Sequence, residues 1–279
     1  MNNVLDAILN EAWGIMPSAL EAILQIVDRG IDSSNVDPKL FHGSGQTEQQ
    51  ALLAIRGERL DGARRAVLRD STAIIPVMGP IFPRANIFTA YSGATSVDQV
   101  AQDLQVALDS DDVESIILNI DSPGGAITGV SELADQIFEA RGEKPITAFV
   151  YGYAASAAYW IASAADEIVS TDTGRIGSIG VVAAWTDTSR RDEKLGIDNI
   201  EIVSSQSPKK RVDIQSAEGR RQIQTLVDQL AEVFVGAVAR NRDVETETVL
   251  ADFGAGDVFV ANRAIDAGMA DRIGSLEAL

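Results

Sequence analysis

Residues 152–160 read Gly-Tyr-Ala-Ala-Ser-Ala-Ala-Tyr-Trp, which sets one serine, Ser156, among small residues. The preceding residues, 146–151, are β-branched and aromatic, as is typical of a buried strand, and the alanines that follow favour a closely packed helix. Ser156 is therefore expected where a strand turns into a helix, at the positive end of the helix dipole, where a developing alkoxide is favoured. The alternative is a small serine in a tight contact between helix and sheet.

The composition is that of a globular protein with one large domain and an accessory part: 279 residues, 46% hydrophobic and 23% charged. A formal net charge of −18 disfavours nonspecific binding to nucleic acid or to an anionic membrane. The absence of cysteine excludes disulfides, thiolate nucleophiles and cysteine metal sites, and a single histidine excludes a multi-histidine metal centre. An acyl-enzyme mechanism on a serine, to which the motifs below point, would need neither a metal nor an organic cofactor.

Two segments bear on membrane association. Residues 1–24 begin without a basic run and contain acidic residues, which is not the pattern of a secretory signal. Residues 146–165 are uncharged over about the length of a membrane-spanning helix, but their first half is strand-like, so a buried strand followed by a buried helix explains them better. We expect a cytoplasmic protein without stable membrane insertion.

The chain divides near residue 70. Residues 1–70 are expected to form a helical arm that mediates assembly, with an apolar helical face at Leu20, Ile23, Leu24 and Val27 and a second helix over 46–60. Residues 71–279 alternate between strand and helix patterns, which predicts an α/β domain of repeated βα units with mainly parallel strands. The expected strands are 73–78, 115–121, 146–151, 167–170 and 179–184, and the expected helices begin at 96 or span 126–141 and 216–241.

A glycine-rich loop follows the second of these strands. Residues 121–125 read Asp-Ser-Pro-Gly-Gly, and Gly124 and Gly125 can expose backbone amides where a side chain would block them, as an oxyanion hole requires. The loop lacks the lysine of a phosphate-binding P-loop and the spacing of the dinucleotide fingerprint. A simple Pro-Gly-Gly turn is the alternative.

A serine nucleophile needs a base. His42, the only histidine, lies in the polar N-terminal part, so a Ser-His-Asp triad would need it to reach Ser156 across the chain. Arginine stays protonated, whereas lysine can act if burial and positive neighbours lower its pKa. Lys209 and Lys210 follow the strand-like residues 199–203. Neighbours in an extended segment point to opposite sides, so only one of the two would face Ser156. A solvated basic turn is the alternative.

Taken together, these motifs resemble the signal peptide peptidase A family of serine peptidases, and in particular its phage prohead (capsid maturation) protease branch. This family has the fold shared by Clp protease and crotonase. The resemblance covers residues 70–275 and rests on five segments: 121–125, 152–156, 173–181, the lysine segment and 258–271.

The resemblance implies a role for each site residue: Ser156 as nucleophile, Lys210 as general base with Lys209 as the alternative, Gly124 and Gly125 as oxyanion-hole amides, and Ser178 as the residue that orients the lysine. The family pattern before the lysine reads Ser-Gly, whereas this chain has Ser207 and Pro208, which leaves the register open by one residue.

The implied function is that of a serine endopeptidase with a Ser-Lys dyad and no metal. It would cleave scaffold or other capsid-assembly proteins in the host cytoplasm or procapsid interior, as a homo-oligomer whose neighbouring subunits can share a site. Three alternatives remain: a bacterial enzyme similar to signal peptide peptidase, a crotonase-like acyl-CoA enzyme, and a noncatalytic capsid assembly or scaffold component.

Overall fold

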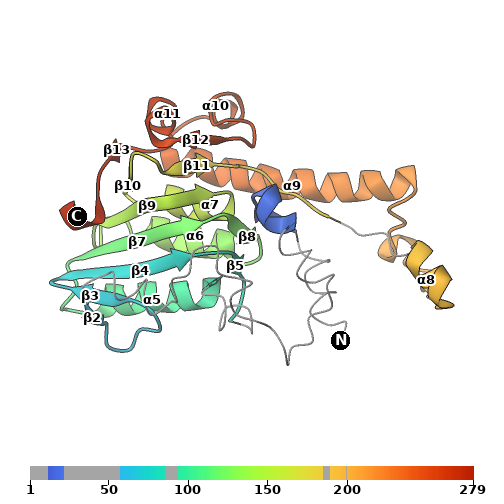
Figure 1. Ribbon diagram of the computed structural model, residues 1–279, viewed down its shortest axis with the longest axis horizontal. Helices are drawn as coiled ribbons and strands as arrows, with labels where there is room; N and C mark the ends of the chain where they lie inside the picture. Colours follow the sequence, from blue (N-terminus) through green and yellow to red (C-terminus); the bar gives the residue numbers. More distant parts are fainter. Residues whose placement is uncertain (1–11, 22–56, 86–93, 185–188, 199) are drawn as a thin grey trace.

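The computed structural model of the chain describes residues 12–21, 57–85, 94–184, 189–198 and 200–279 (Figure 1). Three parallel strands form the middle of its larger sheet: β4 (Thr72–Met78), β7 (Ser115–Ser122) and β9 (Ile146–Ala155). Their central residues are almost all buried, because both faces of the sheet are covered. This accounts for their nearly continuous apolar sequences.

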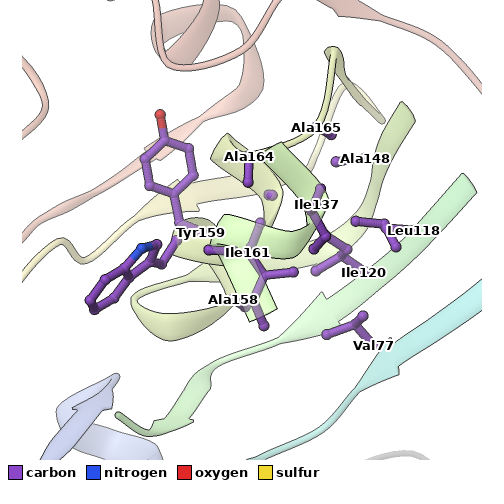
Figure 2. Close-up of a cluster of buried hydrophobic side chains, with 14 of the residues drawn as sticks. Val77, Leu118, Ile120, Ile137, Ala148, Ala158, Tyr159, Ile161, Ala164 and Ala165 are labelled. Atoms are coloured by element: carbon purple, nitrogen blue, oxygen red, sulfur yellow. The ribbon is translucent and has the colours of Figure 1, made fainter. Parts of the chain in front are cut away.

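Helices α5 (Val97–Asp109), α6 (Val130–Glu139) and α7 (Ala157–Ser163) pack on one face of this sheet (Figure 1). All 7 residues of α7 are buried, which requires a helix without charged side chains. Figure 2 shows how side chains of β4, β7, α6 and α7 meet in one apolar cluster. The expected buried strand followed by a buried helix over residues 146–165 is confirmed.

A second sheet, of 4 strands, lies at the ends of β4 and β7 and has the order β1-β8-β5-β6. Its strands are β1 (Trp13–Ile15), β8 (Gly124–Ala126), β5 (Ile81–Phe82) and β6 (Thr95–Ser96). β1 runs antiparallel to β8, which contains both glycines of the 121–125 loop. A short piece of the N-terminal region is thus part of the sheet beside Ser156.

Helix α9 (Ala217–Arg242) is 26 residues long, and its second half holds it to the rest of the chain. There the ring of Phe234 stacks on Trp160 of α7 with 4.6 Å between centroids, and Asn241 Nδ2 donates to Ser163 Oγ at 2.9 Å. The first half carries mostly exposed side chains and extends away from the sheet toward α8 (Ser189–Leu195) (Figure 1).

The remaining elements complete the sheet edges and the C-terminal part: β2 (Glu58–Arg59), β3 (Val67–Arg69), β10 (Glu167–Ser170), β11 (Arg175–Gly177), the 3-10 turn η2 (Pro208–Lys210), α10 (Thr246–Asp252), β12 (Val258–Val260), α11 (Ala261–Asp266), β13 (Arg272–Ile273) and the 3-10 turn η3 (Leu276–Ala278). β10 and β11 both pair in parallel with β9, along its first and last residues respectively. The mainly parallel α/β fold expected from the sequence is confirmed.

Several expected element positions need correction. The strand expected over 179–184 is wrong: Val182 forms one isolated bridge, and the strand is β11, which ends at Gly177. Residues 200–203 are not a strand either: their β-branched side chains are exposed, and no strand within the described residues pairs with them. The helix expected from 126 starts at Val130, since β8 takes the residues up to Ala126.

Much of the expected N-terminal arm, including Ile23, Leu24, Val27 and His42, lies outside the described residues. The helix expected over 46–60 does not include 58–59, which form β2. β2 pairs with β3, and β3 pairs with β4, so these residues extend the larger sheet. The division at residue 70 stays a prediction. Of the helices in the described ranges, none is both long and apolar enough to cross a bilayer.

Candidate active site

Ser156 occupies the sharp turn between β9 and α7. Its backbone has φ 55° and ψ −120°, a conformation that L residues adopt only at a cost of about 1–3 kcal/mol. The turn is held on both sides: Ser156 N donates to Gly177 O at 2.7 Å, and Trp160 N donates to Ser156 O at 3.0 Å. The position predicted for Ser156, at a junction of strand and helix, is confirmed. The strained geometry is the one that serine nucleophiles use to project Oγ from the end of a strand.

The Ser156 hydroxyl is enclosed by backbone rather than by charged side chains. The residue is 1% exposed, and its Oγ donates to Gly180 O at 3.4 Å, a long hydrogen bond. Ser178 follows Gly177, whose carbonyl holds Ser156, so these two serines are neighbours across the turn. Ser178 is buried and also has a positive φ, 55°. The structure therefore brings the predicted lysine-orienting serine to the nucleophile.

The glycine loop approaches Ser156 from the end of β7. At Gly124, which has φ 96°, a Cβ would lie 2.9 Å from Ala155 O and 3.0 Å from Ser156 Cβ. At Gly125, a Cβ would lie 2.0 Å from Ile81 O. Only glycine lets the backbone of both residues come this close. Gly124 thus lies directly against the serine, and Gly125 follows it in β8 against the backbone of Ile81.

The two glycine amides differ in what they can bind. Gly124 N donates to Ser122 Oγ at 3.2 Å, within the loop. Both glycines pair with β1, Gly125 with Gly14 and Gly124 with Ile15. Because Met16 N donates to Pro123 O and Ile127 N donates to Ala12 O, the alternation of the antiparallel ladder turns the Gly125 amide toward β1, so this amide is the one positioned for an incoming peptide. A further donor, which the sequence analysis missed, is the amide of Ala157. It is the first residue of α7, and the first amides of a helix have no intrahelical partner. The position of Ala157 directly after the proposed nucleophile is the sequence feature that could have indicated this donor.

A half-buried carboxylate supports the strand that leads to Ser156. Asp121 Oδ1 accepts a hydrogen bond from Tyr153 N at 3.0 Å, and a Cβ at Gly152 would lie 2.4 Å from the same oxygen. Burial raises the pKa of Asp121 above its ordinary value of 3.8, against the opposing effect of the Arg175 guanidinium. Asp121 therefore fixes the register of β9 near its end. It also explains why residue 152 is a glycine, because any side chain there would collide with the Asp121 carboxylate.

The predicted base is not beside Ser156 in this structure. Lys209 and Lys210 are both exposed on η2, and Gln222 Nε2 donates to Lys209 O at 3.1 Å, which fixes η2 to the first half of α9. Gln222 lies about 18 Å before Phe234 along the axis of α9, and Phe234 marks the contact with α7. The expectation of an extended segment here is wrong, because Pro208 starts a 3-10 turn. Alternation between two faces therefore does not decide between the two lysines.

The other described lysines are also accounted for. Lys144 Nζ donates to Ala107 O at 2.8 Å and to Ser110 O at 2.7 Å at the end of α5, and Lys194 is exposed on α8. Lys39 and His42 lie outside the described residues. Within the ranges that the structure describes, three or more His, Asp or Glu side chains do not come together in a group that could bind a metal ion.

Comparison with protein families agrees with this geometry. The profile of peptidase family S49 matches residues 139–279, half of the chain, from the end of α6 through Ser156 to the C-terminus. The chain belongs to peptidase family S49. The profile named Clp protease matches residues 74–176 of this S49 chain, which include the parallel strands and the glycine loop. The family resemblance and the Clp-like fold expected from the sequence are confirmed.

Individual relatives include both phage and cellular proteins. The S49 chain is 28% identical over 280 residues to the head-tail preconnector protein GP5 of Enterobacteria phage P21, covering 98% of this chain and 55% of that protein. It is 33% identical over 239 residues to the capsid assembly protease C of Escherichia phage lambda, covering 83% and 54%. It is 28% identical over 165 residues to the chloroplastic serine protease SPPA of Arabidopsis thaliana, covering 57% and 24%. The chain spans about half the length of the two phage relatives.

Proposed function

We propose that this chain is a serine endopeptidase that cleaves peptide bonds through an acyl-enzyme on Ser156. The observation that carries the proposal is the strained backbone of Ser156, which holds a buried hydroxyl against the glycine loop of residues 121–125. A strained serine at the end of a strand, next to converging backbone amides, is the arrangement that acyl transfer requires.

In this mechanism Ser156 Oγ attacks the substrate carbonyl, and the developing oxyanion accepts hydrogen bonds from backbone amides. Gly125 N and Ala157 N are the donors placed for this role, and Gly124 holds the loop in position. A lysine takes the proton from Oγ and passes it to the leaving amine, after which water hydrolyses the ester. Ser178, next to the Gly177 carbonyl, orients the lysine amine.

The lysine comes from a neighbouring copy of the chain. The segment from α8 through the first half of α9, described over residues 189–198 and 200–229, extends away from the sheet (Figure 1). From here on we call this segment, and not the N-terminal region, the arm. The arm exposes several large apolar side chains: Leu195 at 65%, Ile200 at 86%, Ile202 at 95% and Leu226 at 50%. Exposed apolar surface of this kind is typical of an interaction site. In a homo-oligomer the arm can carry Lys210, or Lys209, to the Ser156 of the next subunit, where burial favours a neutral amine.

The names of the phage relatives suggest the substrates. One is called a capsid assembly protease and the other a head-tail preconnector protein. We propose that this chain acts on scaffold or other capsid-assembly proteins, in the host cytoplasm or inside the procapsid. The similarity to the putative signal peptide peptidase SppA of Enterococcus faecium, 28% identical over 249 residues, supports the alternative of an enzyme similar to signal peptide peptidase.

A cleavage assay tests the proposed function. The oligomer should release fluorescent peptides from an unfolded, dye-quenched protein, and Ser156→Ala should abolish this release while circular dichroism and oligomer mass stay unchanged. Ser163→Ala is the matched control, because Ser163 is a buried serine on α7 whose Oγ donates to Trp160 O and accepts from Asn241 Nδ2, both away from Ser156. Full activity in Ser156→Ala would exclude the mechanism. Inactivity of the wild type on all unfolded substrates, together with no reaction of Ser156 with a fluorophosphonate, would favour a noncatalytic assembly component.

A further inference from the structure

Strand β1 lies between two backbone segments that border Ser156. On one side it pairs antiparallel with β8, where Met16 N donates to Pro123 O at 2.9 Å and Ile127 N donates to Ala12 O at 3.1 Å. On the other side Trp13 exchanges two hydrogen bonds with Val182, at 3.0 and 2.8 Å. The segment 12–16 therefore fills a channel with backbone partners on both edges, which is how a bound peptide is held by strand addition.

The register of β1 sets Gly14 opposite the nucleophile. Gly14 pairs with Gly125, and a Cβ on Gly14 would lie 3.3 Å from Ser156 Oγ. The Gly14 carbonyl oxygen is so close to Gly124 that a Cβ there would lie 2.2 Å from it. Because the pairs at 12/127 and 16/123 are hydrogen-bonded, the alternation of an antiparallel ladder makes Gly14–Gly125 a hydrogen-bonded pair too. The carbonyl of Gly14 thus occupies the place of a substrate carbonyl.

The side chains next to Gly14 anchor the strand. Trp13 and Ile15 point to the side opposite Gly14, because side chains alternate along a strand. They are 2% and 3% exposed, and they pack with Phe82 and Ala126 in a small cluster separate from the main core. The Trp13 and Phe82 rings meet edge to face, with centroids 6.3 Å apart. Two apolar anchors flank a residue without a side chain, at the point where a side chain would meet Ser156.

We propose that residues 12–16 are a built-in occupant of the peptide channel, a strand that mimics a bound substrate and restrains the peptidase until it is displaced. The inference rests on the proposed function, because it takes the channel at Ser156 as the place where substrates bind. The strand uses the edges of β8 and Val182 that an extended substrate would use, so the two cannot bind together. Opening the channel requires the release of a three-residue strand and two side chains, without any change in the larger sheet.

Gly14→Val in the full chain tests the proposal, because its branched side chain cannot fit between Ser156 and Ile127. Trp13→Asp is a second variant, which removes the main anchor. Ser18→Val is the matched control, since Ser18 is exposed in the same segment, just after the strand. Each protein is treated with a fluorophosphonate, and the rate of modification is followed by intact mass. Minor states of two-state proteins are populated at about 0.1–10%, so release of the strand should raise the rate about tenfold or more.

A binding measurement keeps the test independent of catalysis. A fluorescent peptide of sequence Ala-Trp-Gly-Ile-Met, copied from residues 12–16, should bind Gly14→Val and Trp13→Asp in a Ser156→Ala background at least about tenfold more tightly than Ser156→Ala alone. Equal peptide affinity in all these proteins would overturn the proposal, even if no protein reacts with the fluorophosphonate and the proposed function has failed. A wild-type mass lowered by residues 1–14 would also overturn it, because the strand would then be a substrate and not a standing occupant.

Discussion

Two inactive variants should restore activity when they are mixed. In the proposed assembly each site takes Ser156 from one subunit and Lys210 from the next. Ser156→Ala and Lys210→Ala should each be inactive alone. In an equal, random mixture, a site works when a Lys210→Ala subunit supplies the serine and a Ser156→Ala subunit supplies the lysine. Each condition holds for half of the subunits, so the mixture should regain about a quarter of the wild-type activity.

The position of Lys210 is the reason for proposing shared sites. Lys210 is exposed on η2, which is hydrogen-bonded to Gln222 of α9. Gln222 lies about 18 Å along the axis of α9 from Phe234, which marks the contact of α9 with α7. Within this conformation the amine of one chain stays away from its own serine. Subunit exchange is induced by dilution and reconcentration and is verified by native mass spectrometry. Activity is then followed with the dye-quenched protein substrate.

Two controls define the outcome of the mixing experiment. Ser156→Ala mixed with the double variant Ser156→Ala/Lys210→Ala should stay inactive, and Lys194→Ala, which changes another exposed lysine of the arm, should keep full activity. No recovery despite mixed oligomers would refute shared sites. Full activity in Lys210→Ala would move the base to Lys209, for which Lys209→Ala is the corresponding test.

Three further predictions concern the framework of the site. Phe234→Ala should lower the free energy of unfolding by about 3–5 kcal/mol in urea titrations, because it removes a fully buried ring stacked on Trp160, whereas the neighbouring Val233→Ala, at a site 54% exposed, should cost far less; equal losses would contradict the packing. Asp121→Asn should remove a loss of stability that the wild type shows as pH rises from 3.8 through the raised pKa of the half-buried carboxyl, since the native state favours the neutral form; parallel stability curves between pH 3 and 7 would contradict this. Gly125→Ala should reduce peptide cleavage at least about tenfold, because its Cβ would lie 2.0 Å from a carbonyl oxygen of β5 and displace the amide that faces the substrate; unchanged cleavage would exclude that amide from the oxyanion hole.

The central βα units could be predicted because their signals are local. Continuous apolar runs identified β4, β7 and β10, and the switch to alanines after residue 153 located the turn at Ser156. The long helix α9 was expected within one residue at each end, since Ser216 caps it with its Oγ accepting from Gly219 N at 2.9 Å. Local pattern and tertiary packing agree at these positions.

The failures occur where distant segments decide the structure. Residues 179–184 and 200–203 have strand-like composition, but among the described residues they form only the single bridge at Val182. β1 is a strand because β8 and Val182 lie on either side of it. The local sequence of β1, Trp13 to Ile15, does not predict this pairing. Ser207 and Pro208, which precede Lys209 and Lys210, indicate the turn η2. The composition of the segment does not indicate that η2 lies within an exposed arm. The serine side of the site was therefore predictable, whereas in the proposed assembly the lysine side lies on a second copy of the chain.

The role of Ser156 as nucleophile is tested most directly by covalent modification of the intact oligomer. A fluorophosphonate should add one adduct per subunit, and sequencing of the modified peptide should place it on Ser156, with modification absent in Ser156→Ala and retained in Ser163→Ala. Modification of a different residue, or equal modification of Ser156→Ala and the wild type, would contradict the account.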